Sequence, residues 1–313
     1  MKLTKPKFWE TRCNFFSILL LPFTLILIIL ISIKKKITKV IDFNIPIICV
    51  GNLFIGGTGK TPISILIGKE LSKINRKPVI VKKFYKSHED EHELIKSHFN
   101  NLILKQKREV AINDAKNMGY DTVILDDGFQ DYKIKKDLNI LCFHENQLIG
   151  NGFVFPAGPL RESLHAIKDV DIIIINGRKN IDFEEKLLNL NRNIAIFYSK
   201  YQTQDIDEFR GKNLLAFAGI GNPENFFNLL SKDNLIVEKK LTFPDHYEYS
   251  KTELLNIVDY SRKKNLHIVT TEKDFFRIKK FNLKEINSIN VNLQVEQKEK
   301  FIKKILNIYG KNF

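Results

Sequence analysis

The stretch IICVGNLFIGGTGKTPISILIGKEL, residues 47–71, decides the fold of this chain. Its first four residues are apolar, its middle is rich in glycine, and its last part has apolar residues at helical spacing. A strand, a glycine-rich loop and a helix in this order turn backbone N–H groups and a helix N-terminus toward bound phosphate. The sequence therefore predicts a phosphate-binding loop at the carboxyl end of a strand.

The predicted loop departs from the usual G-x-x-x-x-G-K-[ST] pattern at its first position, where Phe54 replaces glycine. Gly56 and Gly57 lie nearer to the lysine and compensate, so we favour a phosphate loop over a merely structural turn. Lys60 supplies a cation for the β- and γ-phosphates of ATP, and the Thr61 hydroxyl can bind Mg²⁺. The residues assigned to nucleotide binding are Phe54, Ile55, Gly56, Gly57, Thr58, Gly59, Lys60 and Thr61.

A pair of carboxylates follows a later apolar run, TVILDDGFQ, residues 122–130. Asp126 and Asp127 stand where this strand ends, and the carboxyl ends of strands in an α/β sheet face the ligand crevice. Carboxylate oxygens suit Mg²⁺, which they bind directly or through water. We predict that the pair holds Mg²⁺ beside the phosphate loop; the alternative is a structural Asp-Asp-Gly turn.

The rest of the chain alternates short apolar runs with helical stretches, which predicts an α/β fold with a parallel sheet. A polar stretch at residues 200–212 predicts a boundary. It separates a P-loop NTPase-like core, residues 41–205, from a second, smaller α/β lobe, residues 206–313, that closes the cleft. The last helix is expected at residues 296–308. Expected strands are residues 47–50, 79–81, 122–125, 139–143, 172–175, 194–198, 214–218 and 268–270.

Residues 15–33 form an uncharged apolar run between basic flanks, within a predicted N-terminal membrane anchor helix at residues 1–40. As a helix this run is about 28 Å long, close to the ~30 Å hydrocarbon core, so it can span a bilayer or lie in one leaflet. Lys and Arg outnumber Asp and Glu by 50 to 36. This excess favours a nucleic acid, a membrane surface or a phosphorylated substrate as partner.

Residues 88–92, HEDEH, match the H-E-x-x-H pattern of zinc metalloproteases through His88, Glu89 and His92. The short stretch from Lys60 to His88 leaves no room for a complete ATPase module before a protease domain. A zinc-binding helix would also pack an apolar face at its interior positions, where this chain is doubly acidic. A solvated charged turn is the second alternative. We favour a catalytic use of the acidic residues, because they follow the second strand on the crevice side.

Six stretches together resemble the tetraacyldisaccharide 4'-kinase family of lipid A synthesis, in the order in which that family has them. The apolar N-terminal segment also resembles the membrane helix of that family. The six stretches are GNLFIGGTGKTP (51–62), DDGFQ (126–130), PAGPLRE (156–162), AFAGIGNPENFF (216–227), FPDHYEY (243–249) and TTEKDFFR (270–277).

The resemblance implies an ATP-dependent kinase that phosphorylates the 4'-hydroxyl of a lipid A precursor, a tetraacyldisaccharide 1-phosphate, and forms lipid IVA. Because ATP is cytosolic, the enzyme is expected on the cytoplasmic face of the inner membrane, with a membrane surface and no nucleic acid as partner. Asp90 and His246 are implied to act together at the acceptor hydroxyl. We expect these two residues in different lobes, brought together by lobe closure. No oligomeric state is predicted.

The resemblance further implies that Glu91, with Asp126, Asp127 and Thr61, surrounds Mg²⁺. Gln130 and Arg161 are the implied substrate contacts, and a guanidinium suits phosphate binding. For Arg161 the alternative is an ion pair with a neighbouring acid.

Two departures from the family pattern bear on substrate contacts. Where the family has S-R-G-Y-G, this chain has KKFYK (82–86), which keeps only Tyr85, and Asp131 replaces the histidine that usually follows DDGFQ. TTEKD also invites comparison with the guanine-binding [NT]-K-x-D motif, but Lys273 directly precedes Asp274 and the spacing fails. A membrane-anchored P-loop NTPase switch is therefore the weaker alternative.

Overall fold

The computed structural model describes residues 6–11 and 14–310. Residues 1–5, 12 and 13 of the expected anchor lie outside the described residues.

The chain forms two compact units. Of the described residues, the core unit comprises 6–11, 14–84, 101–200 and 295–310, and the second unit comprises Tyr85–Asn100 and Tyr201–Gln294. The division after Lys200 falls at the start of the predicted boundary stretch. The sequence predicted two contiguous ranges, but the chain passes between the units more often. Residues 85–100 belong to the second unit, and the chain returns to the core unit at Val295.

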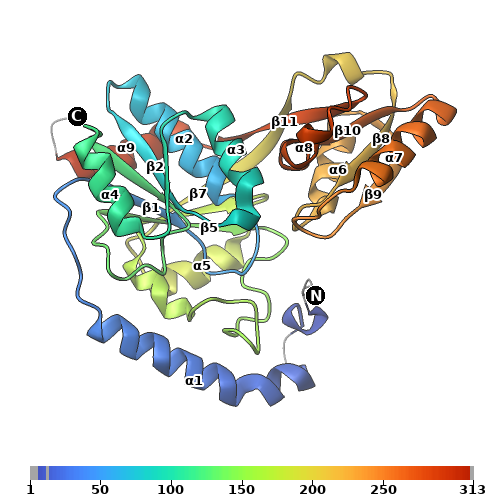
Figure 1. Ribbon diagram of the computed structural model, residues 1–313. Helices are drawn as coiled ribbons and strands as arrows, with labels where there is room; N and C mark the ends of the chain where they lie inside the picture. The colour runs from blue at the N-terminus through green and yellow to red at the C-terminus, as the bar shows by residue number, and fades with distance from the viewer. Residues whose placement is uncertain (1–5, 12–13, 311–313) are drawn as a thin grey trace. The chain divides into compact units, whose positions relative to one another are not determined.

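The core unit is built on a parallel sheet, part of which is labelled in Figure 1. Its strands lie in the order β3-β2-β4-β1-β5-β6-β7. All residues of β1 and β6 are buried, as central parallel strands require apolar residues on both faces. The strands are β1 Ile47–Gly51, β2 Pro78–Lys83, β3 Leu102–Lys105, β4 Thr122–Asp126, β5 Leu138–His144, β6 Ile172–Asn176 and β7 Ala195–Gln204.

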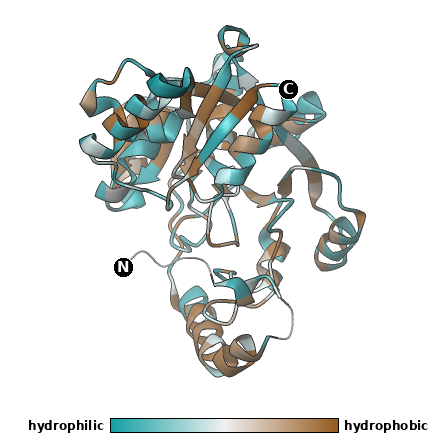
Figure 2. Ribbon diagram, turned by 90° about the vertical axis from the view of Figure 1, so that its right-hand side faces the viewer, coloured by the Kyte–Doolittle hydropathy of each residue, from teal (hydrophilic) through white to brown (hydrophobic). Residues whose placement is uncertain are grey.

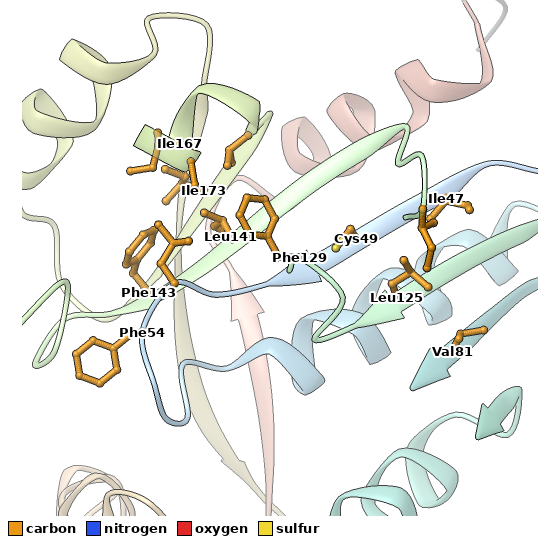
Figure 3. Close-up of a cluster of buried hydrophobic side chains, with 14 of the residues drawn as sticks. Ile47, Cys49, Phe54, Val81, Leu125, Phe129, Leu141, Phe143, Ile167 and Ile173 are labelled. Carbon is orange, nitrogen blue, oxygen red and sulfur yellow. The ribbon is translucent and has the colours of Figure 1, made fainter. Parts of the chain in front are cut away.

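Helices cover this sheet and bury its apolar side chains. One cluster joins Ile47 and Cys49 of β1 to residues of α4 and α5, and Figure 3 shows these two β1 side chains with Leu125 and Val81 of the neighbouring strands. Helix α2 packs on β1, β2 and β4. The helices of the core unit are α1 Phe15–Ile37, α2 Lys60–Lys73, α4 Arg108–Asn117, α5 Ile181–Leu190 and α9 Lys298–Leu306.

The second unit has a smaller parallel sheet in the order β11-β10-β8-β9. Alternate residues of β8 enter two clusters, one with α6 and one with α7, so helices cover both faces. Its strands are β8 Asn213–Ala218, β9 Ile236–Thr242, β10 His267–Thr271 and β11 Ile286–Val295. Its helices are α3 Glu89–His98, α6 Pro223–Lys232, α7 Lys251–Lys264 and α8 Glu272–Ile278.

The α/β fold with a parallel core sheet and a second α/β unit is confirmed, and each of the eight expected strands is present. Strands β3, β9 and β11 were not expected from the sequence.

Helix α1 is apolar over most of its surface (Figure 2). Among the described residues it is the one helix that could cross a membrane by length and composition, with a mean hydropathy of 2.9 over a window that is 11% buried. Two polar side chains on it are buried. The Thr24 hydroxyl donates to Val154 O and accepts from Ala157 N, each at 3.1 Å, and Ser17 accepts from Asn151 at 3.1 Å. These bonds hold α1 against the core unit.

The end of β1 is closed by Phe129, which leaves no room for a side chain at Gly51. A Cβ built on Gly51 would lie 2.5 Å from Phe129 Cβ. We therefore expect Gly51→Ala to lower the free energy of unfolding by ~1–3 kcal/mol through overpacking.

Gly57→Ala is the matched control, since no described atom lies within 4 Å of the Cβ it would add. Chemical unfolding of nucleotide-free protein in detergent measures both variants. Equal stability of Gly51→Ala and the unaltered protein would contradict the close approach.

Candidate functional site

The predicted phosphate loop connects β1 to α2 in the core unit, and glycines shape it. Gly56 has φ of 137° and Gly59, the N-cap of α2, has φ of 90°, values that a side chain would strain. Pro62 lies in the first turn of α2, where its missing N–H breaks no helical bond. The loop thus brings the N-terminus of α2, with its unpaired N–H groups, to the carboxyl end of β1.

The unusual first residue of the loop, Phe54, has a packing role. Its side chain, labelled in Figure 3, is 1% exposed and belongs to the core cluster. Its backbone forms a bridge with Leu160. The next residue, Ile55, donates its N–H to Pro159 O at 2.8 Å. The loop therefore begins with an apolar anchor where the common pattern has glycine.

The middle of the loop is hydrogen-bonded to the Asn52 side chain and contains the buried hydroxyl of Thr58. Asn52 Nδ2 donates to Phe54 O at 2.6 Å and to Gly56 O at 3.0 Å. Thr58 Oγ1 is buried and has no hydrogen-bond partner among the described residues. A buried hydroxyl without a partner is costly unless a ligand satisfies it, and a phosphate oxygen would do so.

Asp126 ends β4 with no exposed surface and receives three donors. Thr61 Oγ1 donates to Oδ2 at 3.0 Å, Ser64 Oγ to Oδ1 at 3.2 Å, and Lys82 Nζ to Oδ2 at 2.6 Å. The register explains the lysine, because Lys82 of β2 and Val50 of β1 are both direct neighbours of Asp126. The carboxylate and the Thr61 hydroxyl thus lie together at the start of α2.

Asp127 lies beside Asp126 but faces different groups. Its φ of 58° turns the chain after β4, and its Oδ1 lies 2.8 Å from Arg161 Nη1 and 3.6 Å from Lys60 Nζ. Burial alone would raise the pKa of Asp127, but the charges of Lys60 and Arg161 bring it down to about 2. Burial also lowers the pKa of Lys60. Asp127 is therefore ionised at neutral pH, at the point where the phosphate loop meets the PAGPLRE turn.

Gln130 and Arg161, the implied substrate contacts, are close to each other. Gln130 Nε2 donates to Glu162 Oε1 at 3.0 Å and to Asn52 O at 3.1 Å, and its Oε1 lies 3.5 Å from Arg161 Nη1. The ion pair considered for Arg161 does form, with Asp127. Both side chains thus border the phosphate loop.

Asp131, where the family has histidine, pairs with Arg108 at 3.5 Å. Arg108 Nη2 also donates to the backbone oxygens of Asp126 and Asp127, at 3.3 and 2.7 Å. Asp131 thus places a carboxylate beside Arg108, the arginine that is hydrogen-bonded to the backbone of Asp126 and Asp127.

The second unit contains another charged group of residues, the Asp90 cluster, made of Asp90, His246 and Arg277. Asp90, on the first turn of α3, is 5% exposed, and its Oδ2 lies 3.5 Å from His246 Nδ1 and 3.1 Å from Arg277 Nε. Burial opposes ionisation, yet the hydrogen bond with His246 and the charge of Arg277 hold the pKa of Asp90 well below its usual range.

The expected placement of Asp90 and His246 in different lobes is wrong. Both belong to the second unit, because residues 85–100 pack there with residues 201–294, and the two side chains are already adjacent. Glu91 also lies in this unit, where it accepts from Lys273 Nζ at 2.9 Å. Asp126 and Asp127, with which Glu91 was expected to share Mg²⁺, belong to the core unit.

The H-E-x-x-H match has a different structure from a zinc helix. His88 precedes α3 and stacks on the His246 ring, with centroids 4.9 Å apart, whereas His92 is buried. Within residues 6–11 and 14–310, no group of three His, Cys, Asp or Glu side chains is placed to hold a metal ion.

Two cations of these sites were missed in the sequence, Lys82 and Arg277. Lys82 interrupts the end of an otherwise apolar strand, PVIVKK, and a charge at a buried strand position is a signal of a buried partner. Arg277 ends the TTEKDFFR stretch and gave no such signal.

Three comparisons with known proteins agree. The family model described as LpxK, tetraacyldisaccharide-1-P 4'-kinase, matches residues 16–309. A tetraacyldisaccharide 4'-kinase of Pelagibacter ubique is 41% identical over 319 residues, which cover all of both chains. One of Rickettsia akari is 34% identical over 315 residues, 95% of this chain and 93% of that one. The crystal structure of LpxK from Aquifex aeolicus in complex with ATP has a similar fold, with a TM-score of 0.73 at 24% identity, over 94% of this chain and 99% of that one.

The buried pair of Lys82 and Asp126 leads to a stability prediction. Lys82→Met keeps much of the side-chain volume but leaves Asp126 buried without its nearest cation. Removing one partner of a buried ion pair costs ~3–5 kcal/mol, and we expect a loss of this size in the free energy of unfolding.

Lys73→Met is the control, because Lys73 forms an exposed pair with Glu70 on α2, worth ~0–1 kcal/mol. Denaturant unfolding of both variants gives the comparison. Similar small losses in the two variants would show that Asp126 does not depend on Lys82.

Proposed function

This chain belongs to the tetraacyldisaccharide-1-phosphate 4'-kinase family, and from that membership we propose which of its residues perform the phosphate transfer. The chain is an ATP-dependent kinase that transfers the γ-phosphate of ATP to the 4'-hydroxyl of a tetraacyldisaccharide 1-phosphate, forming lipid IVA in lipid A biosynthesis. The family match favours this activity over an NTPase switch or a zinc protease.

The observation that carries the assignment is the joint placement of Lys60, Asp127 and Arg161 at the end of the phosphate loop. Phosphoryl transfer depends mainly on positioning and on neutralising the charge of the phosphate oxygens. Lys60 and the N–H groups at the start of α2 supply fixed positive charge for the β- and γ-phosphates. Arg161 and Gln130 lie beside them and are assigned to the phosphorylated lipid substrate.

The core unit has oxygen ligands that fit Mg²⁺. The Thr61 hydroxyl and the carboxylates of Asp126 and Asp127 are hard oxygen donors, and two of them lie 3.0 Å apart. We assign these three residues to Mg²⁺, which when bound neutralises charge on the ATP phosphates. The place of Glu91 in this ligand set is left out of the proposal, because its carboxylate pairs with Lys273 in the second unit.

The Asp90 cluster is assigned to the acceptor. Asp90 and His246 together take the proton of the 4'-hydroxyl as its oxygen forms the bond to the γ-phosphorus, while the bond from phosphorus to the ADP oxygen breaks. The imidazole orients the carboxylate through the 3.5 Å contact of Nδ1 with Oδ2. Proton removal is needed only late in such a transfer, so an ionised Asp90 of low basicity is sufficient.

Helix α1 is assigned to the membrane, lying in one leaflet on the cytoplasmic side of the inner membrane. Thr24 lies near the middle of the helix and is hydrogen-bonded to the core unit. A helix that spans the bilayer would have its midpoint in the hydrocarbon, and would bring the irregular segment 154–157, to which Thr24 is bonded, to the same depth. Irregular backbone does not occur where it is exposed to lipid in the hydrocarbon region. The opposite side exposes Leu19, Phe23 and Ile26, which suit an interfacial helix. ATP and a bilayer-confined lipid are both available at that surface.

Replacing Lys60 tests the phosphate site. We expect Lys60→Ala to lower turnover by on the order of 100-fold or more, because it removes the cation that faces the transferred phosphate. Transfer of ³²P from ATP to a tetraacyldisaccharide 1-phosphate measures the loss, and Lys73→Ala on the exposed side of α2 is the control. Normal turnover of Lys60→Ala would remove the loop from the active site.

Charges on the exposed side of α1 test the membrane assignment. We expect Leu19→Glu with Phe23→Glu and Ile26→Glu to abolish flotation with anionic phospholipid vesicles, because charged groups resist burial in the bilayer. Turnover of detergent-dispersed substrate should persist.

The control is Ile181→Glu, which charges an equally exposed apolar residue on α5 and should leave flotation intact. Vesicle binding by the triple variant would contradict the assignment of α1.

A further inference from the structure

The TTEKDFFR stretch has no role in the transfer as described so far, yet its last residue holds Asp90. Arg277 donates from Nε and Nη2 to Asp90 Oδ2, at 3.1 and 2.5 Å. Its Nη1 donates to Asp274 Oδ1 at 2.7 Å and to Gly219 O at 2.6 Å. The guanidinium is therefore fixed on two sides while it binds a single oxygen of Asp90.

Asp274 is in turn fixed by its own donors. It has no exposed surface and accepts from Gly219 N at 2.9 Å, Tyr249 OH at 2.9 Å and Thr271 Oγ1 at 2.7 Å. These residues come from three stretches that resemble the kinase family, AFAGIGNPENFF, FPDHYEY and TTEKDFFR. The three stretches thus converge on one buried network whose outermost member is Arg277.

The network distinguishes the two oxygens of Asp90. Oδ2 receives Arg277 and lies 3.5 Å from His246 Nδ1. For Oδ1 the described residues provide no hydrogen bond. A carboxylate held by one oxygen keeps its rotamer and leaves the other oxygen open to a hydroxyl donor.

A purely structural tie between α3 and α8 does not explain this arrangement. Two other contacts already join these helices, the ion pair of Lys273 with Glu91 at 2.9 Å and the hydrogen bond between His98 Nε2 and Glu272 Oε1 at 2.7 Å. Both are more exposed than the pair of Arg277 and Asp90. Burying a further ion pair costs desolvation that its attraction barely recovers, so stability alone gives little reason for it.

We propose that Arg277 is a positioning residue of the kinase reaction, which fixes Asp90 through Oδ2 so that Oδ1 is presented to the acceptor hydroxyl. This inference rests on the acceptor role proposed for Asp90. The hydrogen bonds of Arg277 are with Asp90, His246, Asp274 and Gly219, all in the second unit, so the inference assigns it a role through Asp90 and no contact with substrate.

The test is steady-state kinetics of full-length enzyme in detergent, with ATP and a tetraacyldisaccharide 1-phosphate. Arg277→Gln should lower kcat by roughly 100-fold, the loss expected for misplacement of a reacting group by about 1 Å, with the KM for ATP unchanged. Arg277→Lys keeps the charge but lacks the planar fork whose separate nitrogens reach Asp90 on one side and Asp274 on the other, so it should recover part of this loss. Arg262→Gln, which removes an exposed arginine of α7, should have the kcat of the unaltered enzyme.

A double variant separates positioning from folding. If Arg277 acts through Asp90, adding Arg277→Gln to Asp90→Asn should lower kcat no further than Asp90→Asn alone. Multiplicative losses would overturn the inference, as would a normal kcat in Arg277→Gln. If Arg277→Gln does not fold, the test uses Arg277→Lys, provided that its melting temperature is unchanged. A lowered kcat in this variant then supports the positioning role, and a normal kcat overturns it.

The same data separate this inference from its premise. A normal kcat in Asp90→Asn would remove Asp90 from the reaction, and the role of Arg277 with it. A low kcat in Asp90→Asn beside normal values in both Arg277 variants would leave the acceptor role intact and overturn only the positioning role.

Discussion

The burial of one carboxylate, that of Asp126, sets the arrangement of the phosphate site. A charge with no exposed surface is stable in a protein only when it is paired and hydrogen-bonded. Its donors come from Lys82 on β2 and from Thr61 and Ser64 in the first turns of α2. The need to satisfy Asp126 therefore fixes the start of α2 against the strand ends, and with it the loop that leads into that helix.

The two adjacent aspartates then face different partners. Asp126 faces inward and joins elements, whereas Asp127 turns outward through a left-handed backbone conformation and meets Lys60 and Arg161. A residue other than glycine in that conformation costs about 1–3 kcal/mol, and such strain is commonly found at functional sites. Donation from Asp127 N to Val50 O and from Arg108 to the carbonyl oxygen of Asp127 holds the turn. The ionised carboxylate of Asp127 is therefore held next to Lys60, at the end of the glycine-rich loop.

The sequence predicted what depends on local pattern and missed what depends on pairing across the fold. Strands such as β1 and β6 are apolar on both faces and were recognised, whereas β3 is short, and β9 with its charged residues and β11 with its polar ones resemble loops. The phosphate loop and the acidic pair were found because both follow apolar strands. Lys82 and Arg277 act through partners that only the register and the packing of α3 against α8 bring near. The prediction that Asp90 and His246 lie in different lobes was wrong for the same reason. Nothing in the sequence of residues 85–100 shows that this segment packs in the second unit.

The two departures from the family pattern belong to this same charged network and balance each other. Lys82 adds a cation to Asp126, and Asp131 adds a carboxylate to Arg108. With both present, the paired groups are Lys60, Lys82, Arg108 and Arg161 against three aspartates, an excess of one positive charge. Replacing both residues by uncharged ones would leave three cations against two aspartates, and the same excess. The net charge of the paired groups is therefore the same, so Lys82 and Asp131 compensate each other where either alone would shift the local electrostatics.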